Sequence, residues 1–238
     1  MSIVFVGDVH LHPQGTEKDR RFLDFLRSHR SLESVYLLGD IFDYWIGPKM
    51  LKGGDYREVL DGLAALSKSG VKLWWIHGNR DYLIEEKFAK RTGVKILGDG
   101  VTLSLGGRTV YAAHGDFIYN KNSNYTAYRR LMNFEIPQKI FTAIPRAVSA
   151  GMARGFKVVS KKTTPSYRWT REEIVKGARR HFERGAEVLI CGHIHLPMHV
   201  ACEHRSTTRD IYVLGDWDGT SEYVEWDGKG FAFRRPEA

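Results

Sequence analysis

Residues 3–10 read Ile-Val-Phe-Val-Gly-Asp-Val-His, and this stretch decides the fold. Four apolar residues, mostly β-branched or aromatic, end at a glycine, which predicts a short buried strand over 3–6. The polar side chains of Asp8 and His10 follow at once. Side chains of this kind, placed directly after a buried strand, are typical of a ligand site at the carboxyl edge of a parallel sheet.

The same arrangement recurs four more times, each time where a strand is expected to end. Because parallel strands carry their carboxyl ends to one edge of a sheet, we expect all five runs to converge there. The four further runs are Gly39-Asp40-Ile41-Phe42-Asp43, Gly78-Asn79-Arg80-Asp81, His114-Gly115-Asp116 and Gly192-His193-Ile194-His195.

The apolar periodicity of the first half predicts strands that alternate with helices. This alternation favours a mainly parallel sheet that is covered on both faces. We expect strands over 3–6, 35–38 and 72–76, and helices over 18–28, 58–68 and 84–92.

The second half carries hairpin signals as well as helices. Gly106-Gly107 is expected to join a hairpin over 101–113, and turns at Asp218-Gly219 and Asp227-Gly228 are expected to join late strands. A helix is expected over 171–184, followed by a strand over 187–191.

The segment 125–159 is basic, apolar and helical in its periodicity, and Pro137 and Pro145 interrupt it. Two interpretations stay open: its apolar face packs on the core, or it forms a lid or pocket for an apolar ligand. We therefore predict one domain, residues 1–238, with a helical insertion over 120–165.

Charge and hydropathy narrow the class of protein. Lys and Arg number 36 against 28 Asp and Glu in 238 residues, a formal charge of +8 that suits an anionic partner such as a nucleotide or a membrane surface. The chain shows no recognised nucleic-acid module, so no nucleic-acid partner is expected, and no obligatory protein partner either. It lacks a signal peptide and any run near the ~20 apolar residues of a membrane span, which predicts a cytoplasmic location, peripheral on the inner membrane at most.

The five runs offer enough carboxylate, amide and imidazole groups for two cations that share one carboxylate. A mixed oxygen and imidazole set favours Mn²⁺, Fe²⁺ or Zn²⁺ over Ca²⁺. Side chains at i and i+2 of an extended chain share a face, so Asp8 and His10 can reach one ion. His193 and His195 have the same spacing, and Asp40 is the expected bridge. Taken singly, an Asp in such a position is more often a turn or cap residue, and a lone His is more often an ordinary polar residue than a ligand.

In this order, the motifs resemble those of the calcineurin-like metallophosphoesterases. The resemblance implies an α/β fold, with a two-sheet β-sandwich flanked by helices, and a nucleophilic water activated by two divalent ions. It assigns one ion to Asp8, His10, Asp40 and His195, and the other to Asp40, Asn79, His114 and His193.

Arg80 stands where most members of that family have His. A histidine can protonate an alkoxide leaving group, whereas the guanidinium stays charged and can only hold phosphoryl oxygens. A phosphate monoester, whose second pKa is ~6, leaves without that proton, so Arg80 favours attack on a P–O–P bond. The alternative is a salt bridge between Arg80 and a structural acid.

Motifs around Asp40, Asn79 and His114, together with Leu214-Gly215-Asp216-Trp217, are similar to those of the UDP-2,3-diacylglucosamine hydrolases of lipid A synthesis. The resemblance implies cleavage of that nucleotide-linked lipid into UMP and 2,3-diacylglucosamine 1-phosphate, usually with Mn²⁺. It implies catalytic roles for Asp40, Asn79, Arg80 and His114, and substrate contacts by Arg80, Asn122, Ser160, Lys161, Lys162 and His195.

Two other functions stay open. One keeps the chemistry but changes the substrate: a soluble phosphatase, phosphodiesterase or nuclease acting on another nucleotide or phosphoester. The other is a nucleic-acid-binding protein with structural metals, which the lack of aromatic residues interleaved with Lys or Arg disfavours.

Overall fold

The computed structural model describes residues 2–13, 15–119, 169–218 and 222–236. The predicted insertion over 120–165 and the helical segment 125–159 lie outside these ranges, as do Asn122, Ser160, Lys161 and Lys162. Within them, none of the helices combines the length and the apolarity needed to cross a bilayer.

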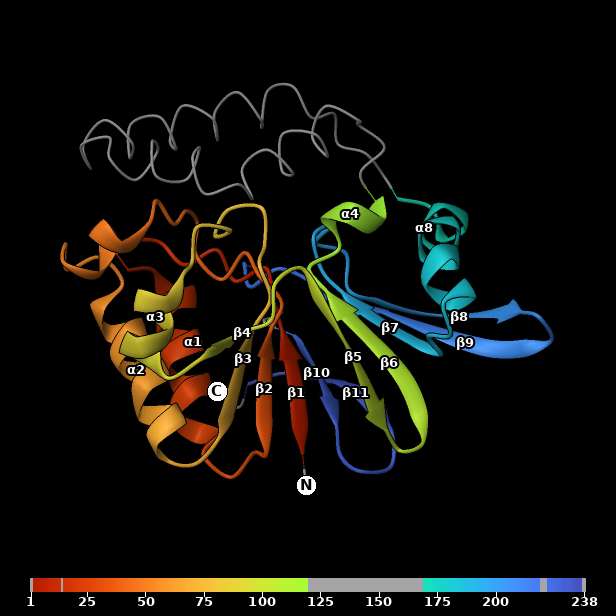
Figure 1. Cartoon of the computed structure of the whole chain (residues 1–238), viewed down its shortest axis with the longest axis horizontal. Coiled ribbons are helices and arrows are strands. Elements are labelled where there is room, and N and C mark those ends of the chain that lie inside the picture. The colour runs from red at the N-terminus through yellow and green to blue at the C-terminus, as the bar shows by residue number, and fades with distance from the viewer. Residues whose placement is uncertain (1, 14, 120–168, 219–221, 237–238) are drawn as a thin grey trace.

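Two β-sheets form the centre of the molecule (Figure 1). The first has six strands in the order β11-β10-β1-β2-β3-β4, and its four strands β1 to β4 run parallel. These strands are β1 (Ile3–Val6), β2 (Ser34–Leu37), β3 (Lys72–Trp75), β4 (Lys95–Ile96), β10 (Tyr223–Trp226) and β11 (Phe231–Arg234).

The second sheet has five strands in the order β5-β6-β7-β9-β8. Its parallel neighbours are β6 with β7 and β7 with β9, while hairpins add β5 and β8 at the edges. These strands are β5 (Gly100–Leu105), β6 (Arg108–Ala113), β7 (Val188–Cys191), β8 (Met198–His204) and β9 (Thr207–Val213).

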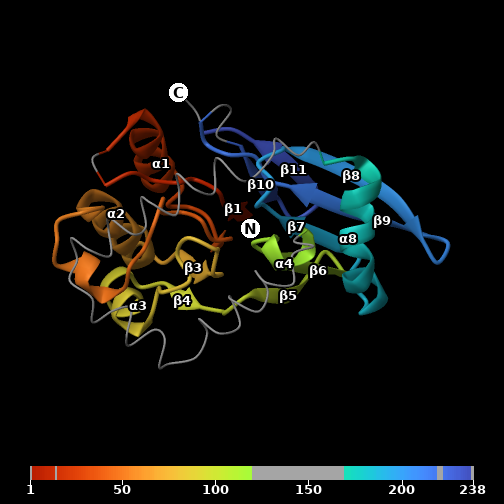
Figure 2. The ribbon, with the colours of Figure 1, turned by 90° about the horizontal axis from the view of Figure 1, so that it is seen from above.

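Helices cover the outer face of each sheet, as the view from above shows (Figure 2). Helices α1 (Glu17–Ser28), α2 (Arg57–Lys68) and α3 (Glu86–Thr92) pack on the first sheet, and α8 (Arg171–Glu183) packs on the second. The short elements η1 (Pro48–Leu51) and α4 (Asp116–Tyr119) lie in the connections. The fold is thus the expected two-sheet sandwich flanked by helices.

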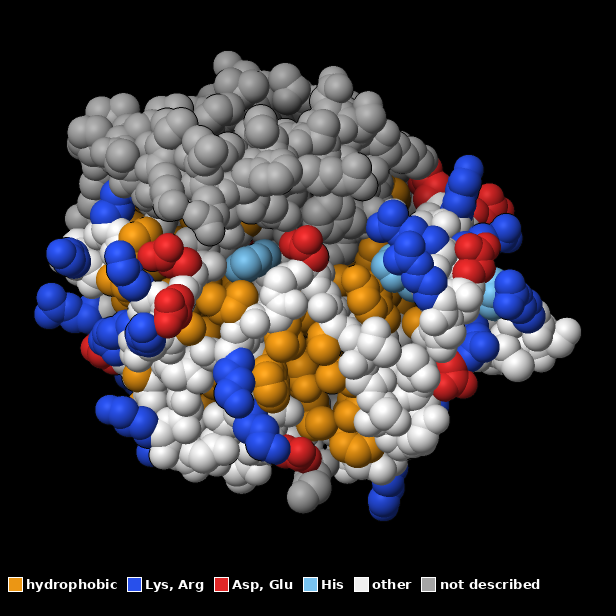
Figure 3. All heavy atoms as spheres, viewed as in Figure 1, with side chains coloured by type: hydrophobic (Ala, Val, Ile, Leu, Met, Phe, Trp, Pro, Cys, Tyr) orange, Lys and Arg blue, Asp and Glu red, His pale blue; other side chains and the backbone are white. Residues whose placement is uncertain are grey.

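The alternation of side chains along each strand builds this layering. In β1, Val4 packs toward the helices, whereas Phe5 packs between the two sheets. Both faces of the strand are therefore buried, which is why β1 reads as a continuous apolar run. Figure 3 shows hydrophobic side chains reaching the surface between the two sheets. Trp74 and Leu103 are partly buried and pack against the cluster between the sheets.

The late strands differ from expectation in two places. The hairpin expected at Asp218-Gly219 is wrong, because β9 belongs to the second sheet and β10 to the first, so the chain crosses between sheets there. The hairpin of β8 and β9 was not predicted. Its turn uses Arg205 and Ser206 at φ 50° and 60°, without the Gly or Asn that normally signals such a turn.

Candidate metal centre

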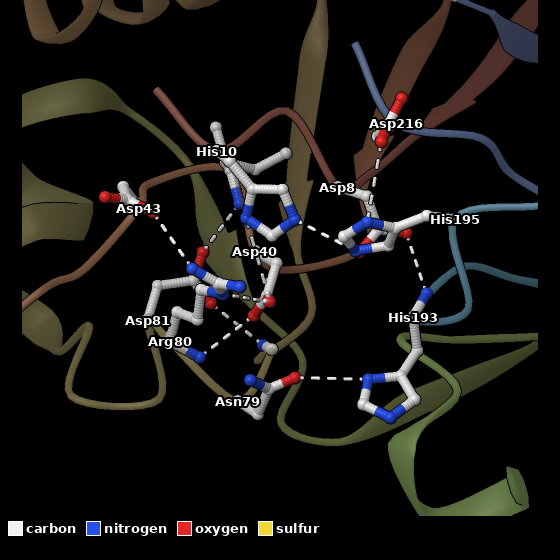
Figure 4. Close-up of polar contacts among 12 residues, drawn as sticks. Asp8, His10, Asp40, Asp43, Asn79, Arg80, Asp81, His193, His195 and Asp216 are labelled. Carbon is white, nitrogen blue, oxygen red and sulfur yellow. Dashed lines mark hydrogen bonds and ion pairs between the residues drawn. The ribbon is translucent and has the colours of Figure 1, made fainter. Parts of the chain in front are cut away.

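Residues of the five motifs meet, as their positions after strands predicted. Figure 4 labels residues from four of these motifs. Asp8, Asp40 and Asn79 follow β1, β2 and β3 of the first sheet, whereas His114 and His193 follow β6 and β7 of the second. The site is therefore assembled from both sheets, at the carboxyl ends of parallel strands.

Three of the predicted ligands form one group. Nε2 of His10 lies 3.0 Å from Nε2 of His195, and the same atom of His195 lies 3.5 Å from Oδ1 of Asp8. Ring nitrogens that face each other at this distance are typical of two imidazoles that share one cation. The ligand atoms of these three residues lie within 4.8 Å of one another.

Three further predicted ligands form a second group. Oδ1 of Asn79 lies 2.9 Å from Nε2 of His114 and 3.2 Å from Nδ1 of His193, and the two ring nitrogens are 3.3 Å apart. One amide oxygen and two imidazole nitrogens thus point at a common volume, which fits a borderline divalent metal.

Asp40 lies between the two groups. Its Oδ2 is 3.9 Å from Nδ1 of His10, and its Oδ1 is 3.7 Å from Nε2 of His114. Each carboxylate oxygen therefore faces a different group, which is the arrangement that a bridging ligand requires.

Buried polar atoms in the centre supply a test of whether cations fit. Oδ1 of Asp8 and Nδ1 of His10 are buried and have no hydrogen-bond partner in the described part of the chain. An unsatisfied buried group costs about 1–3 kcal/mol, and more if charged. A divalent cation held by carboxylate, amide and imidazole would satisfy such atoms, so the residues present fit the predicted metals.

The backbone at the ligands is unusual. The described ranges contain eight non-glycine residues with positive φ, and five of them are predicted ligands. The left-handed conformation costs an L-residue roughly 1–2 kcal/mol, and such residues cluster at functional sites. The five are Asp8, His10, Asp40, His193 and His195, at φ of 52°, 52°, 51°, 75° and 54°.

This conformation corrects one step of the sequence analysis. We expected Asp8 and His10 to share a face because they continue an extended strand. The side chains do lie in the same group, but the backbone reaches that geometry through left-handed turns rather than extended chain.

Glycines let the loops that carry the ligands approach one another. A Cβ on Gly78 would collide with the backbone nitrogen and Oδ1 of Asp40, and a Cβ on Gly192 would collide with Oδ2 of Asp8. The glycines of the motifs are therefore required by backbone contact, not only by turns.

Neighbouring groups hold the ligand side chains in place. Nδ1 of His114 donates to the carbonyl of Leu38 at 3.0 Å, which leaves Nε2 unprotonated toward the second group. The carboxylate of Asp81 accepts from the backbone nitrogens of Ile41 and Gly78, both at 2.9 Å, and so links the loops after β2 and β3. This role of Asp81 was not predicted, although its position two residues after Asn79 was a usable signal.

Electrostatics in the centre favour the unprotonated forms of Asp8, His10 and His193, whereas the pKa values of His195 and Asp40 are raised, that of Asp40 by burial. Burial lowers the pKa of His10 well below its usual value and lowers the pKa of His193 to about 4. Burial also lowers the pKa of His195, but the carboxylates of Asp216 and Asp8, which lie 3.6 and 3.5 Å from its ring nitrogens, outweigh this effect and raise the pKa to about 10. Burial raises the pKa of Asp8, yet the surrounding histidines hold it far below its usual range.

Arg80 lies inside the centre rather than on the surface. Its Nε is 3.3 Å from Oδ2 of Asp40, and its Nη1 donates to Oδ1 of Asp43 at 2.9 Å. The guanidinium thus adjoins the carboxylate that is predicted to bridge the ions, and its other end is hydrogen-bonded to Asp43. Asp216 and Asp43, both outside the predicted ligand set, contact predicted site residues directly.

Fold and ligand arrangement together define a phosphoesterase that depends on two metal ions. The sequence pattern of the family described as calcineurin-like phosphoesterase matches residues 1–197, and the chain belongs to this family. As a member, it is a metal-dependent hydrolase of phosphoester bonds.

Relatives match over nearly the whole chain. A protein named UDP-2,3-diacylglucosamine hydrolase from Aromatoleum aromaticum is 32% identical over 97% of this chain and 95% of its own length. One of the same name from Aeromonas hydrophila is 34% identical over 91% of each chain. Among solved structures, an archaeal phosphodiesterase aligns over 99% of both chains at 13% identity with a TM-score of 0.49, and no functional conclusion is based on this similarity.

Proposed function

We propose that this protein hydrolyses the pyrophosphate bond of UDP-2,3-diacylglucosamine, giving UMP and 2,3-diacylglucosamine 1-phosphate. The observation that carries the proposal is the position of Arg80, whose Nε lies 3.3 Å from the carboxylate that separates the two ligand groups. The names of the relatives, which match along almost the whole chain, point to the same substrate.

Arg80 suits a P–O–P bond better than an alkyl ester. The guanidinium keeps its charge and cannot donate a proton to an alkoxide, but it can hold two phosphoryl oxygens in its planar fork. A leaving lipid phosphate, whose second pKa is ~6, accepts the bond electrons without protonation. We propose that Arg80 exchanges its contact with Asp40 for the phosphate of the substrate.

The two ligand groups support a proposal for the cations. Asp8, His10, Asp40 and His195 would hold one ion, and Asp40, Asn79, His114 and His193 the other, with Mn²⁺ as the expected metal and Fe²⁺ or Zn²⁺ as alternatives. When bound, two such ions stabilise the charge on attacking and leaving oxygens and lower the pKa of a bound water. We propose Asp40, Asn79, Arg80 and His114 as the catalytic residues.

The remaining contacts of the substrate are also proposed. His195 and Arg80 would touch the phosphate, and Asn122, Ser160, Lys161 and Lys162, which lie outside the described residues, would touch the sugar and lipid. The apolar insertion over 120–165 would receive the acyl chains. The basic composition supports a peripheral position on the cytoplasmic face of the inner membrane, where such a lipid resides.

One experiment tests the activity and the site of attack together. The Mn²⁺-loaded protein is given UDP-2,3-diacylglucosamine in ¹⁸O-water, and UDP-glucose and bis(p-nitrophenyl) phosphate serve as comparison substrates. We expect faster turnover of the acylated substrate, with the label in UMP, because attack falls on the α-phosphorus. Equal turnover of UDP-glucose would favour the soluble phosphatase or phosphodiesterase instead.

Arg80 is tested by its leaving-group preference. The variant Arg80→His restores a group that can protonate an alkoxide, whereas Arg80→Lys keeps the charge but loses the fork. We expect Arg80→His to lose at least about 10²-fold on the pyrophosphate, the size of loss typical for one stabilising donor. Its turnover of an alkyl phosphodiester should fall far less. Equal losses on both substrates would contradict the leaving-group argument.

A further inference from the structure

A cavity of about 240 Å³ opens beside the centre and shares His10 with the first ligand group. Four segments form its wall: the loop after β1, the first turn of α1, the loop after β2, and the crossover after β9. Pockets for drug-sized ligands measure roughly 300–1,000 Å³, so this one suits a smaller fragment. Six of its lining residues are His10, Thr16, Glu17, Lys18, Asp43 and Asp218.

The cavity adjoins one side of the centre only. His10 belongs both to its wall and to the ligand group with His195, and Asp43 belongs to its wall and binds Arg80. In Figure 4, His10 and Asp43 lie on the side away from His193. A phosphate held by Arg80 would therefore have this cavity at its His10 side.

The lining is polar and carries no surplus of positive charge. Every lining residue is polar or charged, which makes the cavity unsuited to acyl chains. The ammonium of Lys18 lies 2.9 Å from Oδ1 of Asp218, and Arg80 neutralises Asp43. The wall also holds one further cation, Arg21, which the carboxylate of Glu17 balances, and the hydroxyl of Thr16. Such a surface disfavours a second phosphate and fits an uncharged polyol.

Displacement at phosphorus requires separate binding sites for the two halves of the substrate, the nucleoside and the leaving lipid phosphate. The nucleophile and the leaving group lie in line, whereas the ester oxygen that stays on phosphorus points sideways. The lipid phosphate therefore departs along one axis, and the nucleoside lies in another direction.

We propose that this cavity binds the nucleoside of the substrate, with Glu17 and Asp218 accepting hydrogen bonds from the ribose hydroxyls. Acidic side chains bind ribose hydroxyls in dinucleotide-binding folds for the same reason, since a carboxylate only accepts and a diol donates twice. The inference rests on the proposed function, because it assumes a nucleotide substrate, and it adds where the nucleotide half lies.

The test uses Glu17→Ala and Asp218→Ala, with Glu86→Ala as the matched control. Glu17 is the first residue of α1 and Glu86 the first residue of α3, and both are exposed, so the two changes remove the same helix-end carboxylate. Melting temperatures are compared first, to show that all variants fold.

Binding of UMP and of 2′-deoxy-UMP to the Mn²⁺-loaded protein is then measured by calorimetry. We expect the unsubstituted protein to prefer UMP by about tenfold, which corresponds to one hydrogen bond of about 1.4 kcal/mol. Glu17→Ala or Asp218→Ala should lose this preference, and Glu86→Ala should keep it. In whichever of Glu17→Ala and Asp218→Ala loses the preference, the KM for UDP-2,3-diacylglucosamine should rise about tenfold while kcat stays nearly unchanged. Hydrolysis of bis(p-nitrophenyl) phosphate should stay unchanged in that variant.

The outcomes separate this inference from the proposed function. If the acylated substrate is not cleaved but the preference for UMP depends on Glu17 or Asp218, the proposed function is refuted and the proposed nucleoside cavity is supported. If the substrate is cleaved but UMP and 2′-deoxy-UMP bind equally in every variant, the cavity inference is overturned. Weaker binding of 2,3-diacylglucosamine 1-phosphate, with UMP unaffected, would also overturn it.

Discussion

Oδ2 of Asp216 lies 3.6 Å from Nδ1 of His195, while Nε2 of the same ring faces His10 at 3.0 Å. A carboxylate behind a histidine orients the ring and makes its other nitrogen a better metal ligand. We therefore expect Asp216, which lies on a connection between the two sheets, to position this predicted ligand.

For Asp216→Asn we expect a 10- to 100-fold weaker binding of the first metal ion, the usual cost of losing such a partner. Metal titration followed by calorimetry measures it. Asp210→Asn is the matched control, because Asp210 contacts Nε2 of His199 at 2.7 Å on the β8–β9 hairpin. Equal metal affinity in the two variants would contradict the positioning role.

The stability of the metal-free protein should fall as pH rises from 7 toward 10. The pKa of His195 is raised from 6.5 to about 10 in the folded chain, so the folded state binds the extra proton in this window. That contribution is complete below pH 6.5 and is lost as pH rises through the folded-state value.

Melting curves of the metal-free protein between pH 7 and 9.5 measure this dependence. His195→Gln removes the titrating ring and should flatten the curve. In the metal-loaded protein the trend should reverse, because the cation binds only the unprotonated ring. A metal-free curve that rises over this window would contradict the prediction.

Asp81→Asn should destabilise the fold by about 1–3 kcal/mol, the cost of leaving a buried donor unsatisfied. Asp81 is fully buried and accepts from the backbone nitrogens of Ile41 and Gly78, whereas an asparagine presents its own N–H groups to one of these donors. Urea unfolding measures the change.

Asp61→Asn serves as the control for Asp81. Asp61 is exposed and pairs with Arg91 on the surface, and such pairs contribute about 0–1 kcal/mol. If both variants lost the same stability, the hydrogen bonds of Asp81 to the loops after β2 and β3 would not contribute specifically to the stability of the fold.

Gly78→Ala should reduce hydrolysis at least about 10²-fold, since a displacement of 1 Å at a reacting group can cost that much. The added Cβ would meet the backbone nitrogen and Oδ1 of Asp40, so the bridging carboxylate has to move. Gly230→Ala is the control, because no atom lies within 4 Å of its Cβ position. Steady-state kinetics on bis(p-nitrophenyl) phosphate compare the two.

Metal content should distinguish the bridging carboxylate from a ligand of one group. Asp40→Ala should weaken both ions, whereas His114→Ala should retain one, and both variants should lose nearly all hydrolysis. Elemental analysis after gel filtration gives the stoichiometry, with Asp24→Ala on the exposed face of α1 as the control. Full activity after exhaustive chelation would contradict the two-metal site.

The sequence predicted most of the fold because two independent patterns agreed. Short apolar runs such as 3–6 are buried on both faces, and polar motifs follow them at the sheet edge, so strand and site were found together. The crossover from β9 to β10 near Asp218 was not predicted, because a turn sequence does not indicate which sheet the next strand joins.

The structure brings the predicted ligands together, but the sequence did not predict their backbone conformation. Asp and His tolerate the left-handed region better than most residues, yet nothing local distinguishes Asp8 from an ordinary cap. Its conformation is set by Gly39 and Gly192, which approach from other strands. Contacts of that kind join residues far apart in sequence, and only the folded chain shows them.

Strand β1 lies between β2 and β10, so the first strand of the chain is completed by one of the last. During synthesis β1 leaves the ribosome early, and one of its edges has no hydrogen-bonded neighbour until β10 has been made. His193, His195 and Asp216 emerge late as well. If these residues hold the cations as proposed, the complete set of ligands exists only near the end of translation, and we expect the metals to bind after most of the chain has been made.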